Sequence, residues 1–248
     1  MILLLQKYFP EFSGQQLRAA LTPITGINYK QLGYNRGRQQ LYGYIMNDPF
    51  DNAIYDIYSG IRMECLYDSM NTQCNKAKDL NCEHTIPQSF FAKKEPMVSD
   101  LYHCKISWNV TNNDRSNYPF QYVPDEFAQK YYGLNRQIVT QKPVDRENWS
   151  ILDKRNRFEP RDIQKGDTAR AVAYFYVRYP NEFESLKKTF TLIDDMIEWD
   201  LLFPATDLQN QQAMRIEEIQ GNINPFIKEF GLVRRAYCDL SEGKYPCK

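Results

Sequence analysis

Apolar positions recur every three or four residues in two parts of the chain, a spacing typical of helices with one buried face. The first part begins near residue 13, where Ser13 and Gln16 form the pattern of a capping box. Its apolar face would contain Leu17, Ala20, Leu21 and Ile24. A further helical segment is expected within residues 30–46, before a turn-rich stretch at residues 47–52.

The C-terminal half carries the longest helical patterns. One helix is expected between Asp167 and Tyr179, and Pro180 would end it because proline lacks the amide hydrogen that a helix needs. A second helix is expected over residues 183–201 and a third over residues 208–219, ending at Gly221. The apolar stripes of these helices predict a packed core.

The middle of the chain alternates apolar and polar residues instead, which favours strands. Residues 54–61, 80–87 and 100–107 are each expected to contain a strand, and residues 107–117 a short helix with Ser107 as its N-cap. The sequence therefore predicts one α+β domain over residues 1–248. We expect it to be mostly helical and to surround a small module of two strands and a helix at about residues 80–120.

Charge and composition narrow the function classes only slightly. The 248 residues include 42% hydrophobic and 25% charged residues, and the formal net charge is zero. The chain as a whole therefore has no net electrostatic attraction for a polyanion, and a nucleic-acid site would have to be a local positively charged patch. No apolar run reaches the roughly 18 residues of a membrane span, so no membrane partner is expected.

The two histidines of the chain, His84 and His103, both lie in the predicted module. Glu83 directly precedes His84, and Asn112 lies in the predicted short helix. Carboxylate and amide oxygens are the ligand types that Mg²⁺ and Ca²⁺ prefer. Successive strand residues point to opposite faces, so Glu83 and His84 can share a site only if the strand ends at about Glu83.

The run CEHTIPQSFF … SDLYHCKISWNVTNNDRSNYPF, over residues 82–91 and 99–120, resembles the core of the endonuclease I family. These are exported bacterial nucleases with a ββα-metal finger. Residues 158–180, FEPRDIQKGDTARAVAYFYVRYP, and residues 219–227, IQGNINPFI, resemble two further segments of the family. The resemblance covers most of residues 13–227.

The resemblance implies a role for each matching position. His84 falls on the general base, and Glu83 and Asn112 fall on the two metal ligands. Arg115 falls on the arginine that follows them, which could contact a phosphate. Its alternative role is to anchor the helix structurally. His103 is expected to have a structural role next to the site rather than a catalytic one. This chain departs from the family pattern at Tyr102, where relatives carry a second histidine, and at Ile223, where many carry arginine.

The implied activity is a non-specific endonuclease that hydrolyses DNA, with RNA as a further candidate, and leaves 5′-phosphate ends. A single hydrated Mg²⁺, or Ca²⁺ or Mn²⁺ in its place, would stabilise the phosphate and the leaving 3′ oxygen. Contacts would be made to the phosphate backbone, with Arg115, Arg155 and Arg157 as candidate residues. For the last two, a solvated surface is the alternative, because acidic residues alternate with them. We expect a monomer that is secreted or periplasmic.

Six cysteines suit an exported protein, and their order suggests the pairs 65–74, 82–104 and 238–247. Free buried thiols in a reducing cell are the alternative.

A rival interpretation makes the chain a zinc-stabilised binding module, with Cys82, His84, His103 and Cys104 as ligands. That spacing differs from the usual structural zinc patterns, and His103 and Cys104 would point apart on a strand. An inactive nucleic-acid-binding relative is a second rival, which the intact Glu83, His84 and Asn112 argue against.

Overall fold

The computed structural model describes residues 8–65, 79–187 and 193–247. Its α-helices are α1 Gly14–Gly26, α2 Tyr34–Gln40, α3 Asn109–Arg115, α4 Asp162–Arg178, α5 Pro180–Leu186, α6 Ile193–Leu202, α7 Asp207–Gln220, α8 Pro225–Lys228 and α9 Leu232–Tyr237. Its strands are β1 Ala53–Tyr55, β2 Arg62–Glu64, β3 Leu80–His84, β4 Cys104–Trp108, β5 Ala128–Gly133, β6 Gln137–Val139, β7 Ser150–Asp153 and β8 Phe158–Glu159. The strands form three small antiparallel sheets, β1–β2, β3–β4 and β6–β5–β7–β8. The α+β class is confirmed.

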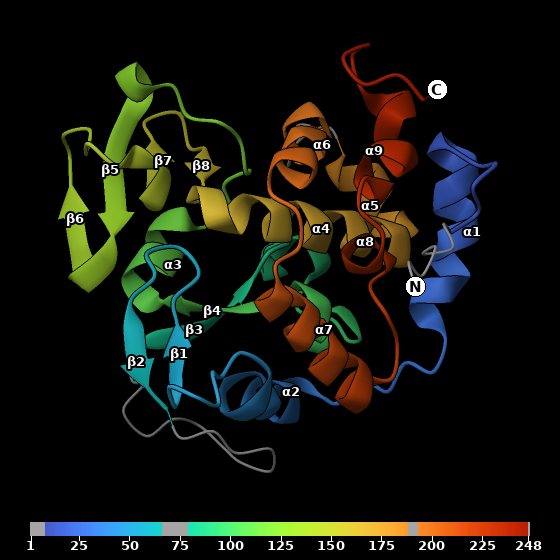
Figure 1. The fold of residues 1–248 in the computed structure, drawn as a ribbon, viewed down its shortest axis with the longest axis horizontal. Helices are drawn as coiled ribbons and strands as arrows, with labels where there is room; N and C mark the ends of the chain where they lie inside the picture. Colours follow the sequence, from blue (N-terminus) through green and yellow to red (C-terminus); the bar gives the residue numbers. More distant parts are fainter. Residues whose placement is uncertain (1–7, 66–78, 188–192, 248) are drawn as a thin grey trace, which may run out of the picture.

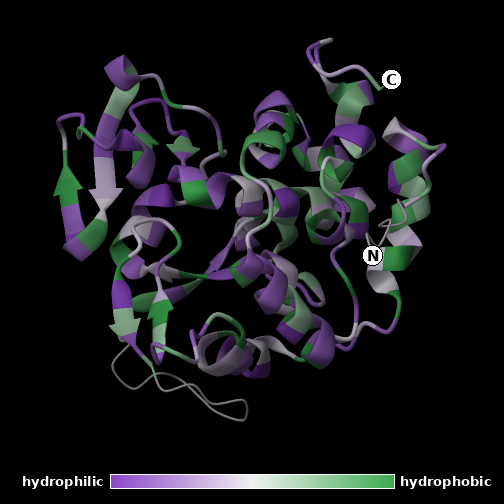
Figure 2. Cartoon of the chain, in the orientation of Figure 1, coloured by the Kyte–Doolittle hydropathy of each residue, from purple (hydrophilic) through white to green (hydrophobic). Residues whose placement is uncertain are grey.

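Helix α4 runs through the middle of the molecule and is buried on all sides from Gln164 to Val177 (Figure 1). Helices α1 and α6 pack on it, and the β5–β8 sheet lies beyond its N-terminal end. Hydrophobic and hydrophilic residues mix along the outer helices α6 and α7 (Figure 2), because only one face of each meets the core. One large apolar cluster joins residues from α1 to α9.

Buried ion pairs satisfy the charged side chains that α4 carries into the interior. Lys105 of β4 pairs with Asp167 at 2.6 Å, and Arg170 pairs with Asp200 of α6 at 3.0 Å. Removing one partner of such a pair would leave an uncompensated buried charge. The pairs therefore fix the orientation of α4 toward the β3–β4 hairpin and toward α6.

The carboxylate of Asp100 collects four hydrogen bonds from different parts of the fold. It accepts from the hydroxyls of Tyr174 and Tyr179 at 2.8 Å each, from the Gln220 side chain at 3.0 Å and from the Tyr102 amide at 3.1 Å. We call Asp100, Tyr174, Tyr179 and Gln220 the Asp100 network. Burial raises the pKa of Asp100, and the donors oppose this shift. The network ties the segment between β3 and β4 to the two helices α4 and α7.

The helical expectations are confirmed for most of the chain, with altered bounds. Ser13 precedes α1 but makes no side-chain capping bond, and residues 34–45 form α2 followed by a π-helical turn. Helix α7 ends at Gly221 as expected, with φ of 89°. The predicted helix 183–201 corresponds to α5 and α6, and residues 188–192 between them lie outside the described residues.

The strand at residues 54–61 is shorter than predicted, because the chain turns after Tyr55 and returns as β2. The four-stranded β5–β8 sheet has no counterpart among the predicted elements. Its strands are two to six residues long, and β7 and β8 are buried throughout, so no clear alternation of apolar and polar positions marks them in the sequence.

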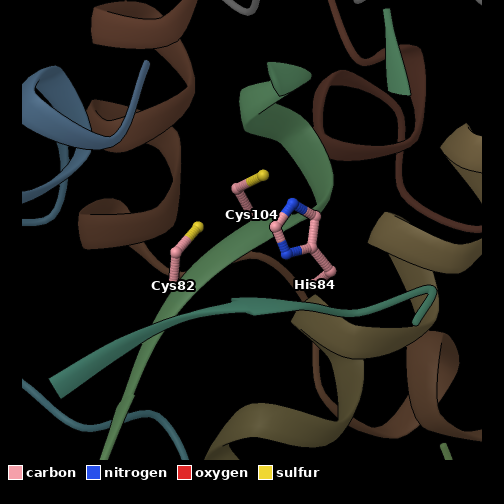
Figure 3. A group of neighbouring side chains, drawn as sticks. All are labelled: Cys82, His84 and Cys104. Atoms are coloured by element: carbon pink, nitrogen blue, oxygen red, sulfur yellow. The ribbon is translucent and has the colours of Figure 1, made fainter. Parts of the chain in front are cut away.

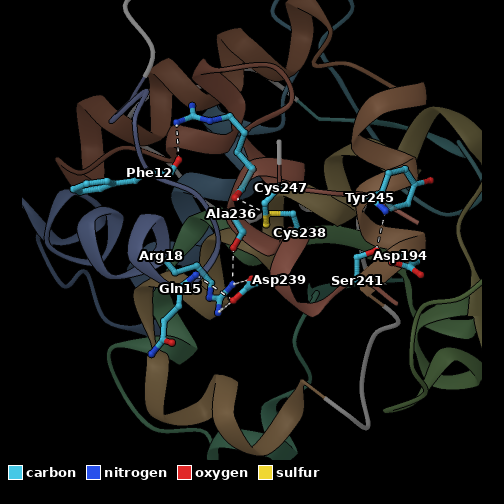
Figure 4. Close-up of a disulfide and its surroundings, with 11 residues drawn as sticks. Phe12, Gln15, Arg18, Asp194, Ala236, Cys238, Asp239, Ser241, Tyr245 and Cys247 are labelled. Carbon is cyan, nitrogen blue, oxygen red and sulfur yellow. Dashed lines mark hydrogen bonds and ion pairs between the residues drawn. A yellow bond between two sulfur atoms is a disulfide. The ribbon is translucent and has the colours of Figure 1, made fainter. Parts of the chain in front are cut away.

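The predicted pairing of Cys238 with Cys247 is confirmed, and this disulfide lies beside the Arg18–Asp239 ion pair that joins α1 to the C-terminal region (Figure 4). The predicted pair 65–74 involves Cys74, which lies outside the described residues. The predicted bridge 82–104 is wrong, because Cys82 and Cys104 are free thiols.

The strand register explains this. Cys82 pairs with Ile106 and Cys104 pairs with His84, so the two cysteines are diagonal neighbours. Diagonal positions lie about 7–8 Å apart between Cα atoms, beyond the usual span of a disulfide.

None of the helices in the described parts of the chain is both long enough and apolar enough to cross a membrane.

Replacing Asp100 with asparagine should lower the free energy of unfolding by about 3 kcal/mol, because an amide NH₂ would face hydroxyl donors inside the core. Chemical denaturation followed by circular dichroism would measure this loss. Glu126→Gln is the matched control, since Glu126 is exposed and its neutralisation should change stability by about 0.5 kcal/mol or less. Equal stability of the two variants would show that the Asp100 network contributes little.

Candidate active site

The β3–β4 hairpin and helix α3 form the module of two strands and a helix expected from the sequence. Helix α3 begins directly after β4, with Trp108 as its N-cap residue. The prediction that Ser107 caps the helix is wrong, since Ser107 lies within β4 and is fully buried. Leaving β3, the chain stays attached to the second arm of the hairpin through a hydrogen bond from the Thr85 amide to the His103 carbonyl, at 2.8 Å.

A cavity of about 260 Å³ opens where β3 ends and α3 passes it. Its lining consists of Cys82, Glu83, His84, Pro87, Gln88, Lys93, Asn112, Arg115 and Ser116. Four residues predicted for the site, Glu83, His84, Asn112 and Arg115, thus border one cavity and come from two segments, β3 and α3.

Glu83 and His84 do project to opposite faces of β3, as strand geometry requires. The Glu83 carboxylate accepts a hydrogen bond from the Tyr58 hydroxyl at 2.6 Å and pairs with Arg115 at 3.2 Å. The His84 ring lies on the other face, near Tyr34 and Phe91. Both residues border the same cavity because the strand ends at His84, one residue later than expected.

The hydrogen bonds of His84 define its tautomer. Its Nε2 lies 2.9 Å from the carbonyl oxygen of Val98, and a carbonyl only accepts, so Nε2 carries the proton. Its Nδ1 lies 2.9 Å from the side-chain nitrogen of Gln88, which donates to it. Gln88 lines the cavity, so the basic nitrogen of His84 is the one on the cavity side.

The pKa of His84 is lowered to about 3, mainly by burial and in smaller part by the nearby His103. The imidazole is therefore neutral across the physiological pH range, and its Nδ1 lone pair can accept a proton.

Arg115 is buried, and several contacts hold its guanidinium in place. Only 1% of its side chain is exposed, and its guanidinium donates to the carbonyls of Thr85 at 2.7 Å and Ser116 at 3.2 Å while it pairs with Glu83. It also lies over the ring of Phe120 at 4.3 Å. These contacts fit the alternative role, an anchor between α3 and the end of β3, and they leave little of the guanidinium for a bidentate phosphate contact.

Glu83 and Asn112 supply the oxygen donors of the cavity. Burial raises the pKa of Glu83, and the Arg115 charge and the Tyr58 hydrogen bond oppose that shift. Asn112 is half-buried on α3, and its side chain makes no hydrogen bond to any described residue. One carboxylate, one uncommitted amide oxygen and an open space for water fit a hard divalent cation such as Mg²⁺.

His103 lies behind His84 and is completely buried. The two rings meet edge to face, with centroids 5.4 Å apart, and His103 Nε2 donates to the Met97 carbonyl at 2.7 Å. Its Nδ1 has no hydrogen-bond partner among the described residues. Burial lowers its pKa to about 4, so this ring is neutral too. The arrangement is compatible with a supporting role and gives His103 no contact with the cavity.

Arg155 and Arg157 do not join the cavity. They lie in the turn between β7 and β8, where the Arg155 guanidinium lies 3.5 Å from the centroid of the Phe127 ring and Arg157 pairs with Asp153. Their expected contact with a phosphate backbone would have to be made outside the cavity.

Three residues that the sequence reasoning missed belong to this site: Tyr58, Gln88 and Lys93. Tyr58 orients Glu83 from a distant segment, and no local pattern marks it. Gln88 follows His84 by four residues in a turn that begins at Pro87, which is a usable signal. Lys93 comes at the end of that turn, where it and Ala92 both have left-handed φ values, 56° and 54°.

The chain was compared with known proteins. It is 25% identical over 171 residues to an extracellular deoxyribonuclease of Aeromonas hydrophila, a match that covers 68% of this chain. The chain spans 61% of the length of that relative. The model of the family described as Endonuclease I matches residues 13–230, which include every cavity residue named above. This chain therefore belongs to the endonuclease I family.

Proposed function

We propose that this protein is a metal-dependent, non-specific endonuclease that hydrolyses phosphodiester bonds of DNA. The observation that carries the proposal is the single cavity that brings a neutral histidine, His84, beside the oxygen donors Glu83 and Asn112. Membership of the endonuclease I family supports it. The relative described as an extracellular deoxyribonuclease favours DNA over RNA as the substrate, and favours a secreted or periplasmic location.

His84 acts as the general base in this proposal. Its Nδ1 takes a proton from a water molecule as the water oxygen forms a bond to phosphorus, and the bond from phosphorus to the 3′ oxygen breaks. The leaving 3′ oxygen takes a proton from solvent water, so the products are a 5′-phosphate and a 3′-hydroxyl. The proton on Nε2 stays bonded to the Val98 carbonyl, which holds the ring in the orientation that presents Nδ1 to the cavity. Gln88, the present partner of Nδ1, must release it to the attacking water.

Glu83 and Asn112 would hold the cation, with Mg²⁺ preferred and Ca²⁺ or Mn²⁺ as alternatives. When bound, the ion supplies positive charge to the phosphoryl oxygens and to the leaving 3′ oxygen. Tyr58 and Arg115 keep the Glu83 carboxylate in place for this task. Because ligands must be deprotonated, cation binding favours the charged form of Glu83 against the effect of its burial.

Lys93 is the residue that we assign to the substrate phosphate. It lines the cavity, is exposed, and makes no ion pair with any described residue. Arg115, by contrast, is committed to Glu83 and to backbone carbonyls. The compact charge of a lysine can contact the phosphate backbone of DNA without contacting the bases, which agrees with a non-specific nuclease.

The His84→Ala variant should cleave plasmid DNA about 10²–10⁴-fold more slowly than the wild type in the presence of Mg²⁺, since this is the usual contribution of a general base. Its metal affinity should change little, because Glu83 and Asn112 remain. The rate of conversion of supercoiled DNA to nicked DNA measures this effect. Cleavage at the wild-type rate by a folded variant would remove His84 from the reaction.

Glu83→Gln and Asn112→Ala should each raise the Mg²⁺ concentration that gives half-maximal activity, by about tenfold or more. The first variant removes the negative charge of one ligand, and the second removes the other ligand. Asn113→Ala is the matched control for Asn112, since Asn113 is the exposed next residue of α3. Full wild-type activity in excess EDTA would contradict the metal requirement itself. An unchanged Mg²⁺ dependence in both ligand variants would contradict the assignment of these two residues.

Lys93→Ala should lower kcat/KM for DNA about tenfold and make it less sensitive to salt, because one phosphate contact and its counterion release are lost. The neighbouring Lys94→Ala removes an equal exposed charge that does not line the cavity, and it should change kcat/KM by about twofold or less. Steady-state rates at several salt concentrations give both quantities. If the two variants lose activity equally, Lys93 contributes only general surface charge.

A further inference from the structure

A second group of metal-binding side chains lies on the reverse side of the catalytic strand. Cys82 and His84 are two residues apart on β3 and therefore project from the same face. Cys104 stands directly opposite His84 on β4. The two sulfur atoms and a ring nitrogen of His84 all lie within 4.8 Å of one another (Figure 3).

The donor atoms of this group differ in chemistry from those of the Glu83–Asn112 pair. Two thiolates and one imidazole are ligands for zinc and related borderline or soft cations, whereas Mg²⁺ and Ca²⁺ select oxygen. With Zn–S bonds of about 2.3 Å and Zn–N bonds of about 2.0 Å, tetrahedral ligands lie roughly 3.5–3.8 Å apart. Shifts of about 1 Å, within reach of side-chain rotation, would close the group around an ion.

The group is buried, and two of its three members border the cavity. Cys82 and His84 both line the open cavity of about 260 Å³, whereas Cys104 is buried behind them. An ion entering through the cavity could keep one water as its fourth ligand, as in zinc sites with three protein ligands. Two thiolates would balance the charge of the ion, so the buried complex would be neutral.

We propose that Cys82, His84 and Cys104 form a zinc-binding site on the face of the β3–β4 hairpin opposite Glu83. As the ion binds, both thiols release their protons to solvent and one ring nitrogen of His84 becomes a ligand. If Nδ1 is the ligand, it exchanges the hydrogen bond from Gln88 for the bond to the metal. If Nε2 is the ligand, its proton moves to Nδ1 and the hydrogen bond to the Val98 carbonyl is lost.

The site has a consequence for activity, which rests on the proposed function. His84 cannot accept a proton from water while it is held by zinc, since the imidazole is then fixed and withdrawn from its base role. Zinc and Mg²⁺ would therefore act in opposite directions through different ligands, the first as an inhibitor and the second as an activator.

Binding is tested first, without any activity measurement. The metal-free full chain, kept reduced with a phosphine, is titrated with Co²⁺ as an optical substitute for zinc. We expect one Co²⁺ per chain with a thiolate-to-cobalt charge-transfer band in the near ultraviolet, displaced by Zn²⁺. Cys82→Ser and Cys104→Ser should each weaken binding at least tenfold, whereas Glu83→Gln should retain the band. Absence of the band in the wild type, or its persistence in both cysteine variants, would overturn the site.

Inhibition is tested second, by DNA cleavage at fixed Mg²⁺ with increasing Zn²⁺. Cys104→Ser should keep the basal Mg²⁺-dependent rate, because Cys104 does not line the catalytic cavity, and should need at least tenfold more Zn²⁺ for half inhibition. Equal sensitivity of the wild type and Cys104→Ser would contradict the inhibitory consequence. If the wild type cleaves no DNA under any condition, the proposed function fails, and the cobalt spectra still decide whether the site exists.

Discussion

The geometry of the site depends on the hydrogen bonds that the buried carboxylate of Asp100 accepts. This carboxylate joins α4 and α7 to the segment that connects β3 to β4, through bonds to Tyr174, Tyr179 and Gln220. That segment presents the carbonyls of Val98 and Met97 to the two histidine rings. The Val98 carbonyl, two residues before Asp100, accepts a hydrogen bond from His84 Nε2, and this bond identifies Nε2 as the protonated nitrogen.

A second constraint acts on the opposite face of the same strand. The buried guanidinium of Arg115 pairs with the Glu83 carboxylate and donates to the Thr85 carbonyl. The Tyr58 hydroxyl, from another segment, donates to the Glu83 carboxylate as well. Such contacts are costly to break because a buried charge would lose its partner. They keep α3 against the end of β3 and so keep Asn112 beside Glu83. In the proposed site, Arg115 therefore positions Glu83 and α3, and Lys93 is the cavity residue that is exposed to solvent.

Much of the site could be predicted because its key residues are close together in the sequence. Glu83, His84 and Asn112 come from one hairpin and the helix that follows it, and local pattern places such elements well. Tyr58 and Lys93 were missed because their roles depend on contacts between distant segments or on the exact course of a turn. The helices were predicted from apolar spacing, whereas the short strands of the β5–β8 sheet carry too few residues for alternation to show. The predicted disulfide between Cys82 and Cys104 was wrong because the sequence does not reveal the strand register. In that register the two cysteines are diagonal neighbours.

In the proposed mechanism, the cavity holds a hard cation between Glu83 and Asn112, and His84 does not bind that cation. Diffraction from crystals soaked in Mn²⁺, with anomalous data, tests this most directly. We expect one anomalous peak within coordination distance, about 2.2 Å, of a Glu83 carboxylate oxygen and the Asn112 amide oxygen. A peak on the His84 ring, or ordered Mn²⁺ only at other carboxylates of the protein, would contradict it.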